Sequence, residues 1–208
     1  MAVWADYQTA GRGCGSNTWE SERGKNLLFS VLIHPADIPV NRQFLVSMAV
    51  ANSIAKVVAQ YVKAVSVKWP NDIYVGDKKL CGILIENRLL GGVIKDSIIG
   101  VGLNVNQLHF RSDAPNPVSL ALLTGRSYHL EVLLQELLAA FDEELADMDG
   151  VRQRYLSQLY RRTGFHRYRD AQGEFAAELM TVEDDGHLVL RRADGQLQRY
   201  AFKEVQFI

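Results

Sequence analysis

The sequence contains few of the residues that define several classes of protein. Its 208 residues include only two cysteines, Cys14 and Cys81, which lie far apart and form no CxxC pair. A disulfide framework and a cysteine-based zinc site are therefore both excluded as organising features. No apolar run reaches the roughly 18 residues that a membrane-spanning helix needs. The first residues also lack the basic and apolar regions of a signal peptide, so we expect a cytoplasmic protein with no membrane partner.

An excess of charge of one sign is also missing. The chain has 23 Lys and Arg residues against 24 Asp and Glu residues, which gives a net charge of −1. This balance disfavours a generally basic nucleic-acid-binding protein, and we expect no DNA partner. The hydrophobic fraction of 48% is ordinary for a globular protein. A chain of this length buries roughly 70% of the surface that its unfolded form exposes, so a substantial core is available.

Apolar periodicity predicts an α+β domain over residues 1–160. Apolar and β-rich runs predict strands, with a turn at Gly76-Asp77, over 26–33, 65–69, 72–75, 79–87 and 93–105. Apolar residues that recur at three and four positions predict helices over 40–62, 130–147 and 151–160. The run 93–105 is expected to offer a free strand edge that a second copy could extend, which would permit a homodimer.

The pattern changes near Thr163-Gly164. From there to Ile208, short β segments are separated by Gly-containing turns at intervals of about eleven residues, a spacing typical of a small all-β module. A module of about 45 residues has little independent stability. We therefore expect residues 163–208 to form a second domain that packs on the first.

Glycines are concentrated in the first candidate site, the segment Gly11 to Ser16. Three glycines in five residues allow the backbone to approach a ligand closely. Consecutive N–H groups there can hold an anion, and Arg12 offers a planar fork for a carboxylate or a phosphate. The segment lacks the GK[ST] ending of a P-loop. On the glycine pattern alone, an ordinary mobile loop remains an open alternative.

The second candidate site is the run Lys68-Trp69-Pro70-Asn71-Asp72. Pro70 disfavours a helical conformation for the residue before it. Asn71 and Asp72 either form an Asx turn or present one amide and one carboxylate at a rigid corner. A carboxylate in that position could hold Mg²⁺ or a ribose hydroxyl.

Lys79 begins the strand 79–87. A period of two puts Lys79 on the same face as Cys81 and opposite Gly82. A lone lysine at the end of a strand is usually a solvated edge residue. A glycine inside a β-rich run, in contrast, indicates that a ligand or another backbone approaches closely.

Two glycines and two asparagines interrupt the last strand of the first domain. Gly100 and Gly102 lie within the apolar run, and Asn104 follows them. The pattern predicts either a bulge at the end of the strand or a flat wall for a ring-shaped ligand, with Asn104 as a polar contact.

Together and in this order, these segments resemble one family. The resemblance rests on Tyr7-Gln8-Thr9-Ala10-Gly11-Arg12-Gly13, Trp19, Lys68-Trp69-Pro70-Asn71-Asp72, Lys79-Leu80-Cys81-Gly82-Ile83-Leu84-Ile85-Glu86 and Gly100-Val101-Gly102-Leu103-Asn104, which look like the catalytic core of a biotin–protein ligase. It covers nearly the whole chain. It implies an α+β fold with a mixed sheet and flanking helices, like that of class II aminoacyl-tRNA synthetases, followed by a small SH3-like β-barrel at 163–208.

The resemblance implies an ATP-dependent, AMP-forming ligase. The family joins biotin to ATP to make biotinyl-5′-AMP and then passes biotin to one lysine of the biotin carrier domain of a carboxylase. Biotin is thus the implied substrate, ATP the co-substrate and Mg²⁺ the metal. Two alternatives are a non-catalytic relative that binds biotin or the carrier domain, and a lipoate–protein ligase.

The resemblance also implies a role for individual residues. Arg12 and Lys79 would bracket two anions, the biotin carboxylate and the α-phosphate, whose mutual repulsion in a partly dry site is several kcal/mol. The implied contacts of biotin are Gln8, Gly11, Arg12, Gly13, Cys14, Lys79, Gly82 and Gly100. The implied contacts of ATP are Trp19, Lys68, Asn71, Asp72 and Asn104, with Asp72 also a candidate metal ligand.

Two departures from the family pattern carry further expectations. Cys14 and Gly15 stand where the family usually has a polar or basic residue and often a second arginine, so the loop has less positive charge. The chain is also expected to be N-terminally short, because nothing in it matches the Ser- or Thr-bearing turn that hydrogen-bonds the ureido ring of biotin. A helix-turn-helix domain is not expected either.

Overall fold

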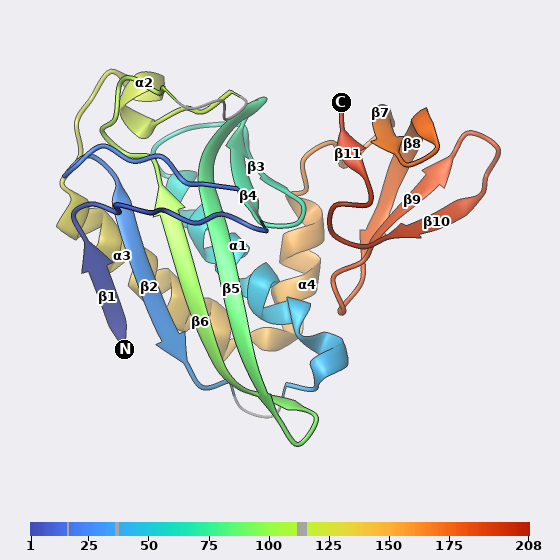
Figure 1. Cartoon of the computed structure of the whole chain (residues 1–208), viewed down its shortest axis with the longest axis horizontal. Helices are drawn as coiled ribbons and strands as arrows, with labels where there is room; N and C mark the ends of the chain where they lie inside the picture. The colour runs from blue at the N-terminus through green and yellow to red at the C-terminus, as the bar shows by residue number, and fades with distance from the viewer. Residues whose placement is uncertain (16, 36–37, 112–115) are drawn as a thin grey trace.

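The structure is a computed structural model that describes every residue except 16, 36–37 and 112–115. It contains two β-sheets and a group of helices (Figure 1). The larger sheet and its helices comprise β1 (Ala2–Ala5), β2 (Leu27–Ile33), η1 (Val40–Arg42), α1 (Phe44–Val58), β3 (Val65–Lys68), β4 (Asp72–Val75), β5 (Lys78–Leu90), β6 (Val93–Leu103), α2 (Leu120–Thr124), α3 (Leu130–Ala146) and α4 (Met148–Ser157). The smaller sheet comprises β7 (Phe165–Asp170), β8 (Gly173–Val182), β9 (Leu188–Arg192), β10 (Leu197–Tyr200) and β11 (Gln206–Phe207).

The strands of the larger sheet lie in the order β1-β2-β6-β5-β4-β3, and each neighbouring pair is antiparallel. The expectation of a mixed sheet was wrong in this detail. Strands β3 to β6 follow one another through short turns, and a short turn joins only antiparallel strands. The expected free edge at 93–105 was also wrong, because β6 pairs with β2 on one side and with β5 on the other.

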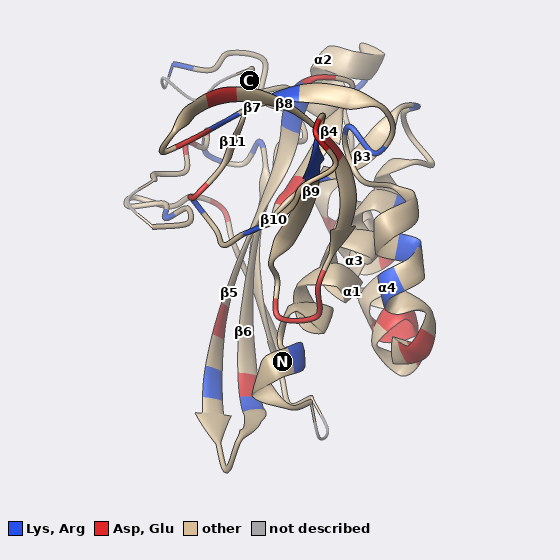
Figure 2. Cartoon of the chain, turned by 90° about the vertical axis from the view of Figure 1, so that its right-hand side faces the viewer, with Lys and Arg blue, Asp and Glu red and all other residues tan. Residues whose placement is uncertain are grey.

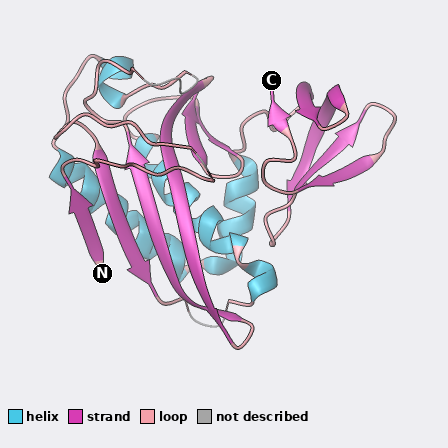
Figure 3. Ribbon diagram, in the orientation of Figure 1, coloured by secondary structure: helices cyan, strands magenta, loops and turns pink. Residues whose placement is uncertain are grey.

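The helices α1, α3 and α4 cover one face of this sheet (Figure 3). Twelve of the 15 residues of α1 are buried, as expected of a helix that is apolar on most sides and packs between a sheet and other helices. Two polar residues in α1 are satisfied across the helix interfaces. Ser53 donates to the carbonyl of Ala140 at 3.1 Å, and Asn52 donates to the carbonyl of Val151 at 3.0 Å.

The predicted helix over 40–62 is shorter in the structure. Residues Val40–Arg42 form a 3₁₀ turn after Pro39, and the α-helix runs only from Phe44 to Val58. Two short elements, β1 and α2, were not predicted from the sequence. Among the described residues, no helix combines the length and the apolar character needed to cross a membrane.

The smaller sheet has the strand order β10-β9-β8-β7-β11, again antiparallel throughout. It does not close into the predicted barrel, because β10 has four residues and β11 only two, and these two edge strands do not pair. The division into domains at 1–160 and 163–208 remains a prediction.

The two sheets are held together by contacts that α1 and the β3–β4 corner make with the β8–β9 turn. The amide of Phe44 donates to the carbonyl of Asp184 at 3.1 Å, and the Trp69 indole donates to the carbonyl of Gly186 at 2.9 Å. A Cβ at Gly186 would lie 2.9 Å from the Phe44 ring. The smaller sheet is therefore positioned next to the β3–β4 corner.

Figure 2 shows Lys and Arg residues interspersed with Asp and Glu residues along the chain. Near the tip of the β5–β6 hairpin, Arg88 pairs with Asp96, whose carboxylate also lies 2.6 Å from Nδ1 of His34. Hydrogen bonds from Arg88 and His34 lower the pKa of Asp96. Arg88 and Asp96 thus neutralise each other at the surface, in keeping with the net charge near zero.

Candidate active site

A cavity of about 320 Å³ lies on the face of the larger sheet opposite the helices. Its floor consists of β5 and β6, and the loop that precedes β2 crosses above them (Figure 1). The Pro70–Asp72 corner forms one wall, and Phe202 from the smaller sheet reaches the same space. The volume is in the range of small-molecule sites. Of the residues implied by the resemblance, those that line the cavity are Gln8, Arg12, Gly13, Cys14, Trp19, Asn71, Asp72, Lys79, Gly82 and Gly100.

The glycines of the loop allow it to fold back on itself. The amide of Trp19 donates to the carbonyl of Gly11 at 2.9 Å, and the amide of Gly13 donates to the carbonyl of Asn17 at 2.7 Å. A Cβ at Gly11 would overlap the Trp19 backbone and lie 3.0 Å from Oε1 of Gln8. Gly11 is therefore required by the turn and does not itself line the cavity. Ser16, the last residue of the motif, lies outside the described residues.

Trp19 rests on two glycines in the floor. Gly82 of β5 pairs with Gly102 of β6. A Cβ at Gly82 would lie 2.9 Å from the Trp19 ring, and one at Gly102 would lie 2.5 Å from it. The close approach predicted at Gly82 is thus made by an indole of the same chain. Nε1 of Trp19 is buried and has no hydrogen-bond partner among the described residues, so it is available to a ligand that accepts a hydrogen bond.

Gly100 has different surroundings from Gly82 and Gly102. A Cβ added there would meet Leu84 only at 3.5 Å and 3.9 Å, which is ordinary contact. Gly100 lines the cavity, so its missing side chain leaves room that a flat ligand can use. The predicted flat wall therefore has two parts. The Trp19 indole covers Gly82 and Gly102, while the space beside Gly100 stays open.

A β-bulge sets the direction of Lys79. Asp72 lies opposite Gly82 and Ile73 opposite Cys81, but Tyr74 lies opposite Lys79, so β5 carries one extra residue at this point. The bulge places Lys79 on the face of Gly82, with its Cε 3.6 Å from where a Gly82 Cβ would be. The strict alternation that put Lys79 with Cys81 was wrong for this reason. Cys81 is fully buried in the core.

Lys79 forms an ion pair inside the cavity. Its Nζ lies 2.7 Å from Oδ1 of Asp72, and the exposed fractions of the two side chains are only 27% and 19%. Burial raises the pKa of Asp72, and the charge and hydrogen bond of Lys79 oppose that rise. Nζ of Lys79 also lies 5.7 Å from the centre of the Trp19 ring, a cation–π distance. The lysine is therefore held by a carboxylate on one side and an aromatic ring on the other.

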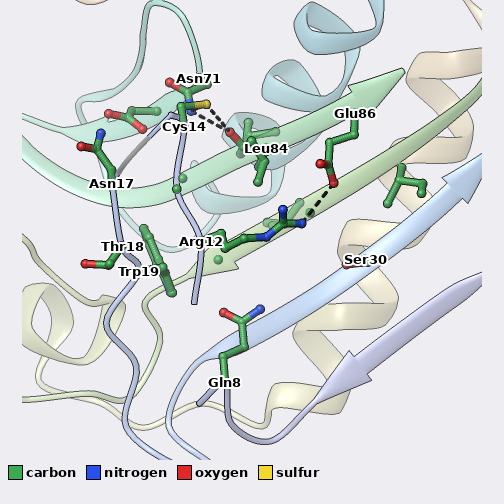
Figure 4. A pocket seen from close by; sticks show the side chains of 18 of the residues that line it. Gln8, Arg12, Cys14, Asn17, Thr18, Trp19, Ser30, Asn71, Leu84 and Glu86 are labelled. Carbon is green, nitrogen blue, oxygen red and sulfur yellow. Dashed lines mark hydrogen bonds and ion pairs between the residues drawn. The ribbon is translucent and has the colours of Figure 1, made fainter. Parts of the chain in front are cut away.

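Arg12 forms a second ion pair at the open side of the cavity. Its guanidinium lies 3.3 Å from Oε2 of Glu86, and the two side chains are 72% and 54% exposed. Figure 4 shows Arg12 turned toward Glu86. An exposed pair of this kind contributes about 0–1 kcal/mol. Arg12 can therefore exchange Glu86 for an anionic ligand at little cost.

Cys14 and Asn71 form the wall between the loop and the corner. Nδ2 of Asn71 donates to the carbonyl of Ile83 at 2.7 Å and lies 3.1 Å from Sγ of Cys14 (Figure 4). Burial raises the pKa of the Cys14 thiol, and Asp72 raises it further, while Lys79 and Lys203 lower it. The thiol is therefore a neutral neighbour of the amide.

Two residues with implied ATP contacts do not line the cavity. Lys68 donates to the hydroxyl of Tyr74 at 3.0 Å and its Nζ lies 5.4 Å from the centre of the Phe207 ring, so it is packed between the two sheets. Burial lowers its pKa, and Asp72 opposes that change. Asn104 is buried, and its Nδ2 donates to the carbonyl of Val118 at 3.1 Å. The side chain of Asn104 thus fastens the segment that leads to α2.

Several lining residues were given no role from the sequence. They include Asn17, Thr18, Ser30, Glu86 and Phe202. Ser30 had a signal, since it is the one polar residue after Asn26 in the apolar run that forms β2. Glu86 belonged to a quoted motif, but no partner in the sequence indicated a role for it. Only the fold brings Phe202 next to residues of the loop.

Few of the described side chains are grouped in a way that could bind a metal ion. In the part of the chain that the structure describes, three His, Cys, Asp or Glu ligand atoms come together only at Glu183, Asp185 and His187 of the smaller sheet. Arg199 pairs with both carboxylates there. Asp72 offers a single carboxylate in the cavity, and Lys79 already contacts it.

The sequence and the fold were compared with those of known proteins. Residues 1–104 match the model of the biotin/lipoate A/B protein ligase family. The bifunctional ligase/repressor BirA of Bacillus spizizenii is 29% identical over 210 residues, which cover 96% of this chain and 64% of that protein. The biotin–[acetyl-CoA-carboxylase] ligase of Mycobacterium tuberculosis is 34% identical over 125 residues, 58% of this chain and 44% of that protein. The chain thus spans less than two thirds of the length of these curated relatives.

The fold has a match among solved structures as well. The biotin protein ligase from Aquifex aeolicus, solved in complex with biotin and ATP, aligns with a TM-score of 0.79 and 22% identity. The alignment covers 100% of this chain and 89% of that one. At this identity the likeness concerns the fold, and it extends over both sheets.

Proposed function

Because the chain belongs to the biotin/lipoate A/B protein ligase family, and within it to the biotin–protein ligases, we propose that it adenylates biotin with ATP and transfers the biotinyl group to a lysine of a carboxylase carrier domain. The observation that carries the proposal is the Lys79–Asp72 ion pair at 2.7 Å inside a cavity of small-molecule size. The Lys79 ammonium group, held in the cavity by Asp72, can reduce the repulsion between the biotin carboxylate and the α-phosphate of ATP.

In the first step, a biotin carboxylate oxygen attacks the α-phosphorus of ATP. A bond forms between that oxygen and phosphorus, and the bond from phosphorus to the pyrophosphate oxygen breaks. Charge accumulates on the phosphoryl oxygens, and a fixed cation is most effective there because it needs no reorganisation. Lys79 is the proposed cation, since Asp72 and Trp19 hold its ammonium group in place. Arg12 joins it after leaving Glu86.

In the second step, the lysine amine of the acceptor attacks the acyl carbon of biotinyl-5′-AMP. The new C–N bond replaces the C–O bond to AMP, and the amine loses a proton. The proposed role of the loop over the floor is to cover the mixed anhydride and exclude water during this interval. The proposed biotin contacts are the lining residues Gln8, Cys14 and Gly100, with Trp19 and Asn71 toward the nucleotide.

Mg²⁺ fits the site only as a partner of the nucleotide. The ion prefers one or two carboxylates together with substrate phosphates and water, and Asp72 is the one carboxylate at this corner of the described cavity lining. Asp72 would hold the ion, and the ion would neutralise phosphate charge. Because Lys79 already contacts Oδ1 of Asp72, the ion would share this carboxylate with the lysine.

A binding protein without catalytic activity and a lipoate–protein ligase are the competing interpretations. A protein that only binds biotin has no need of a lysine held by a buried carboxylate, and both Lys79 and Arg12 line the cavity. The free thiols Cys14 and Cys81 suit a reducing cytoplasm, where ATP is available.

Pyrophosphate release tests the proposal. The protein is incubated with ATP and either biotin or lipoate, and release is followed with and without a biotin carrier domain. We expect biotin-dependent release, and one biotin per carrier domain by mass spectrometry. Biotin binding without any pyrophosphate release would identify a non-catalytic relative, and release with lipoate in place of biotin would identify the other ligase.

A further inference from the structure

Residue Lys203 of the smaller sheet lies directly on the glycine loop. It follows Phe202, which lines the cavity, in the turn between β10 and β11. A Cβ at Gly15 would overlap the Lys203 ammonium group and lie 2.8 Å from its Cε. Gly15 has a φ of +69°, so a side chain there would be strained as well as displaced. Neighbouring residues of the turn therefore reach the cavity and the loop above it.

The turn aims Lys203 at the loop at some cost in backbone conformation. Lys203 has a φ of +72°, in the left-handed region that residues other than glycine rarely adopt. The turn is closed by the carboxylate of Glu204, which accepts from the amide of Ala201 at 2.7 Å. Phe202 packs edge-on against Trp69, with ring centres 6.5 Å apart. Trp69 also donates to the carbonyl of Gly186 in the β8–β9 turn, so one residue of the larger sheet contacts two turns of the smaller sheet.

The charge of Lys203 has no counter-ion among the described residues. Arg12 is paired with Glu86, and Lys79 with Asp72, but no described carboxylate lies within ion-pair distance of the Lys203 ammonium group. Burial and Asp72 raise the pKa of the Cys14 thiol, and the charges of Lys79 and Lys203 lower it. The geometric link between Lys203 and the loop is the contact at Gly15, where an added Cβ would overlap the lysine ammonium group.

We propose that Lys203 binds the terminal phosphates of the nucleotide and the pyrophosphate that leaves. This inference rests on the proposed function. The α-phosphate must lie near Lys79, where it meets the carboxylate of biotin, and the remaining phosphates carry most of the negative charge of ATP. Lys203 belongs to the smaller sheet and is a cation at the loop with no carboxylate partner among the described residues. A charge-assisted contact to phosphate is the interaction that such a lysine makes best.

Direct titration of pyrophosphate and of AMP into the protein tests the inference independently of turnover. Lys203→Met removes the charge and keeps the length of the side chain, Lys203→Arg restores the charge, and Lys63→Met removes a charge from an exposed lysine outside the cavity lining. We expect Lys203→Met to weaken pyrophosphate binding about tenfold and AMP binding less than twofold. Lys203→Arg should bind pyrophosphate within about threefold of the parent protein, and Lys63→Met should match the parent.

Two results would overturn the inference. Unchanged pyrophosphate binding in Lys203→Met would show that the charge does not reach the phosphates. Equal weakening of pyrophosphate and AMP would show that Lys203 only supports the loop. The steady-state counterpart is a rise in KM for ATP with little change in kcat. Failure of the parent protein to release pyrophosphate with biotin and ATP would instead contradict the proposed function, while the titrations would still decide the role of Lys203.

Discussion

The two cations that line the cavity are held in opposite ways. Lys79 pairs with Asp72 at 2.7 Å, and both side chains are mostly buried. Arg12 pairs with Glu86 at 3.3 Å, and both side chains are mostly exposed. A buried pair leaves an uncompensated charge when one partner is lost, whereas an exposed pair exchanges with water and salt. The site therefore combines one fixed cation with one that can be exchanged for substrate.

Loss of the fixed cation should have the largest effect. We expect Lys79→Ala to lower the rate of adenylate formation by about 10²–10³, the size of effect that accompanies the loss of one preorganised group that stabilises transition-state charge. Single-turnover pyrophosphate release with biotin and ATP measures this rate. A rate within threefold of the parent protein would rule Lys79 out as a catalytic residue. Circular dichroism checks that the variant is folded.

The same variant should acquire a pH-dependent loss of stability. Burial raises the pKa of Asp72, and Lys79 opposes the rise, so Lys79→Ala raises that pKa further. A carboxyl group with a raised pKa binds its proton more tightly in the folded state, so the free energy of unfolding falls as pH rises through the range above its unfolded value. Urea unfolding between about pH 4 and pH 7 should show this fall, and Lys79→Ala with Asp72→Asn should not. A flat profile in the single variant would contradict the buried pair.

Loss of the exchangeable cation should separate activity from stability. We expect Arg12→Met to slow adenylate formation about 10- to 100-fold, because a charge-assisted contact with substrate is lost. Its free energy of unfolding should change by less than about 1 kcal/mol. Glu86→Gln is the matched control: it breaks the same ion pair but leaves the arginine available, so its rate should stay within about twofold. Equal losses in both variants would mean that the ion pair itself is needed.

The floor offers a further comparison between two glycines of β6. Gly102→Ala places a Cβ 2.5 Å from the Trp19 ring, and overpacking of this kind typically costs about 1–3 kcal/mol. Gly100→Ala meets only ordinary contacts and should unfold within about 0.5 kcal/mol of the parent protein, yet weaken biotin binding. Urea unfolding followed by tryptophan fluorescence, together with biotin titration, distinguishes the two variants. Similar destabilisation by both would refute the placement of the indole.

The smallest expected effect concerns the thiol of Cys14. Burial and Asp72 raise the pKa of Cys14, so alkylation by iodoacetamide at pH 8 should be slower than that of a free thiol. Asp72→Asn should speed the reaction severalfold because it lowers that pKa, and Lys203→Met should slow it. Cys81 is fully buried and serves as the unreactive internal control. An alkylation rate that neither substitution changes would show that the charges of Asp72 and Lys203 do not affect the Cys14 thiol.

The elements that the sequence predicted well are those whose signals are local. The hairpin at Gly76-Asp77, with β4 and β5 on either side, and the amphipathic helix α3 lie where periodicity and turn residues put them. The short elements β1 and α2 were missed because four or five residues carry too little periodicity. The pairing direction of the strands and the open form of the smaller sheet were also beyond local signals, since they depend on which distant strands become neighbours.

By itself, the sequence determined which chemical groups are available: the glycine loop with Arg12, the corner with Asp72, and Lys79 at the start of a β-rich run. Those motifs are contiguous, so their composition and spacing could be recognised. Only the tertiary structure decided where the groups point. One extra residue in β5 moved Lys79 from the core face to the cavity, because side chains alternate along a strand and a bulge reverses the alternation. Packing between the sheets brought Lys203 onto the loop at Gly15, near the other end of the chain, a contact that no local pattern could indicate.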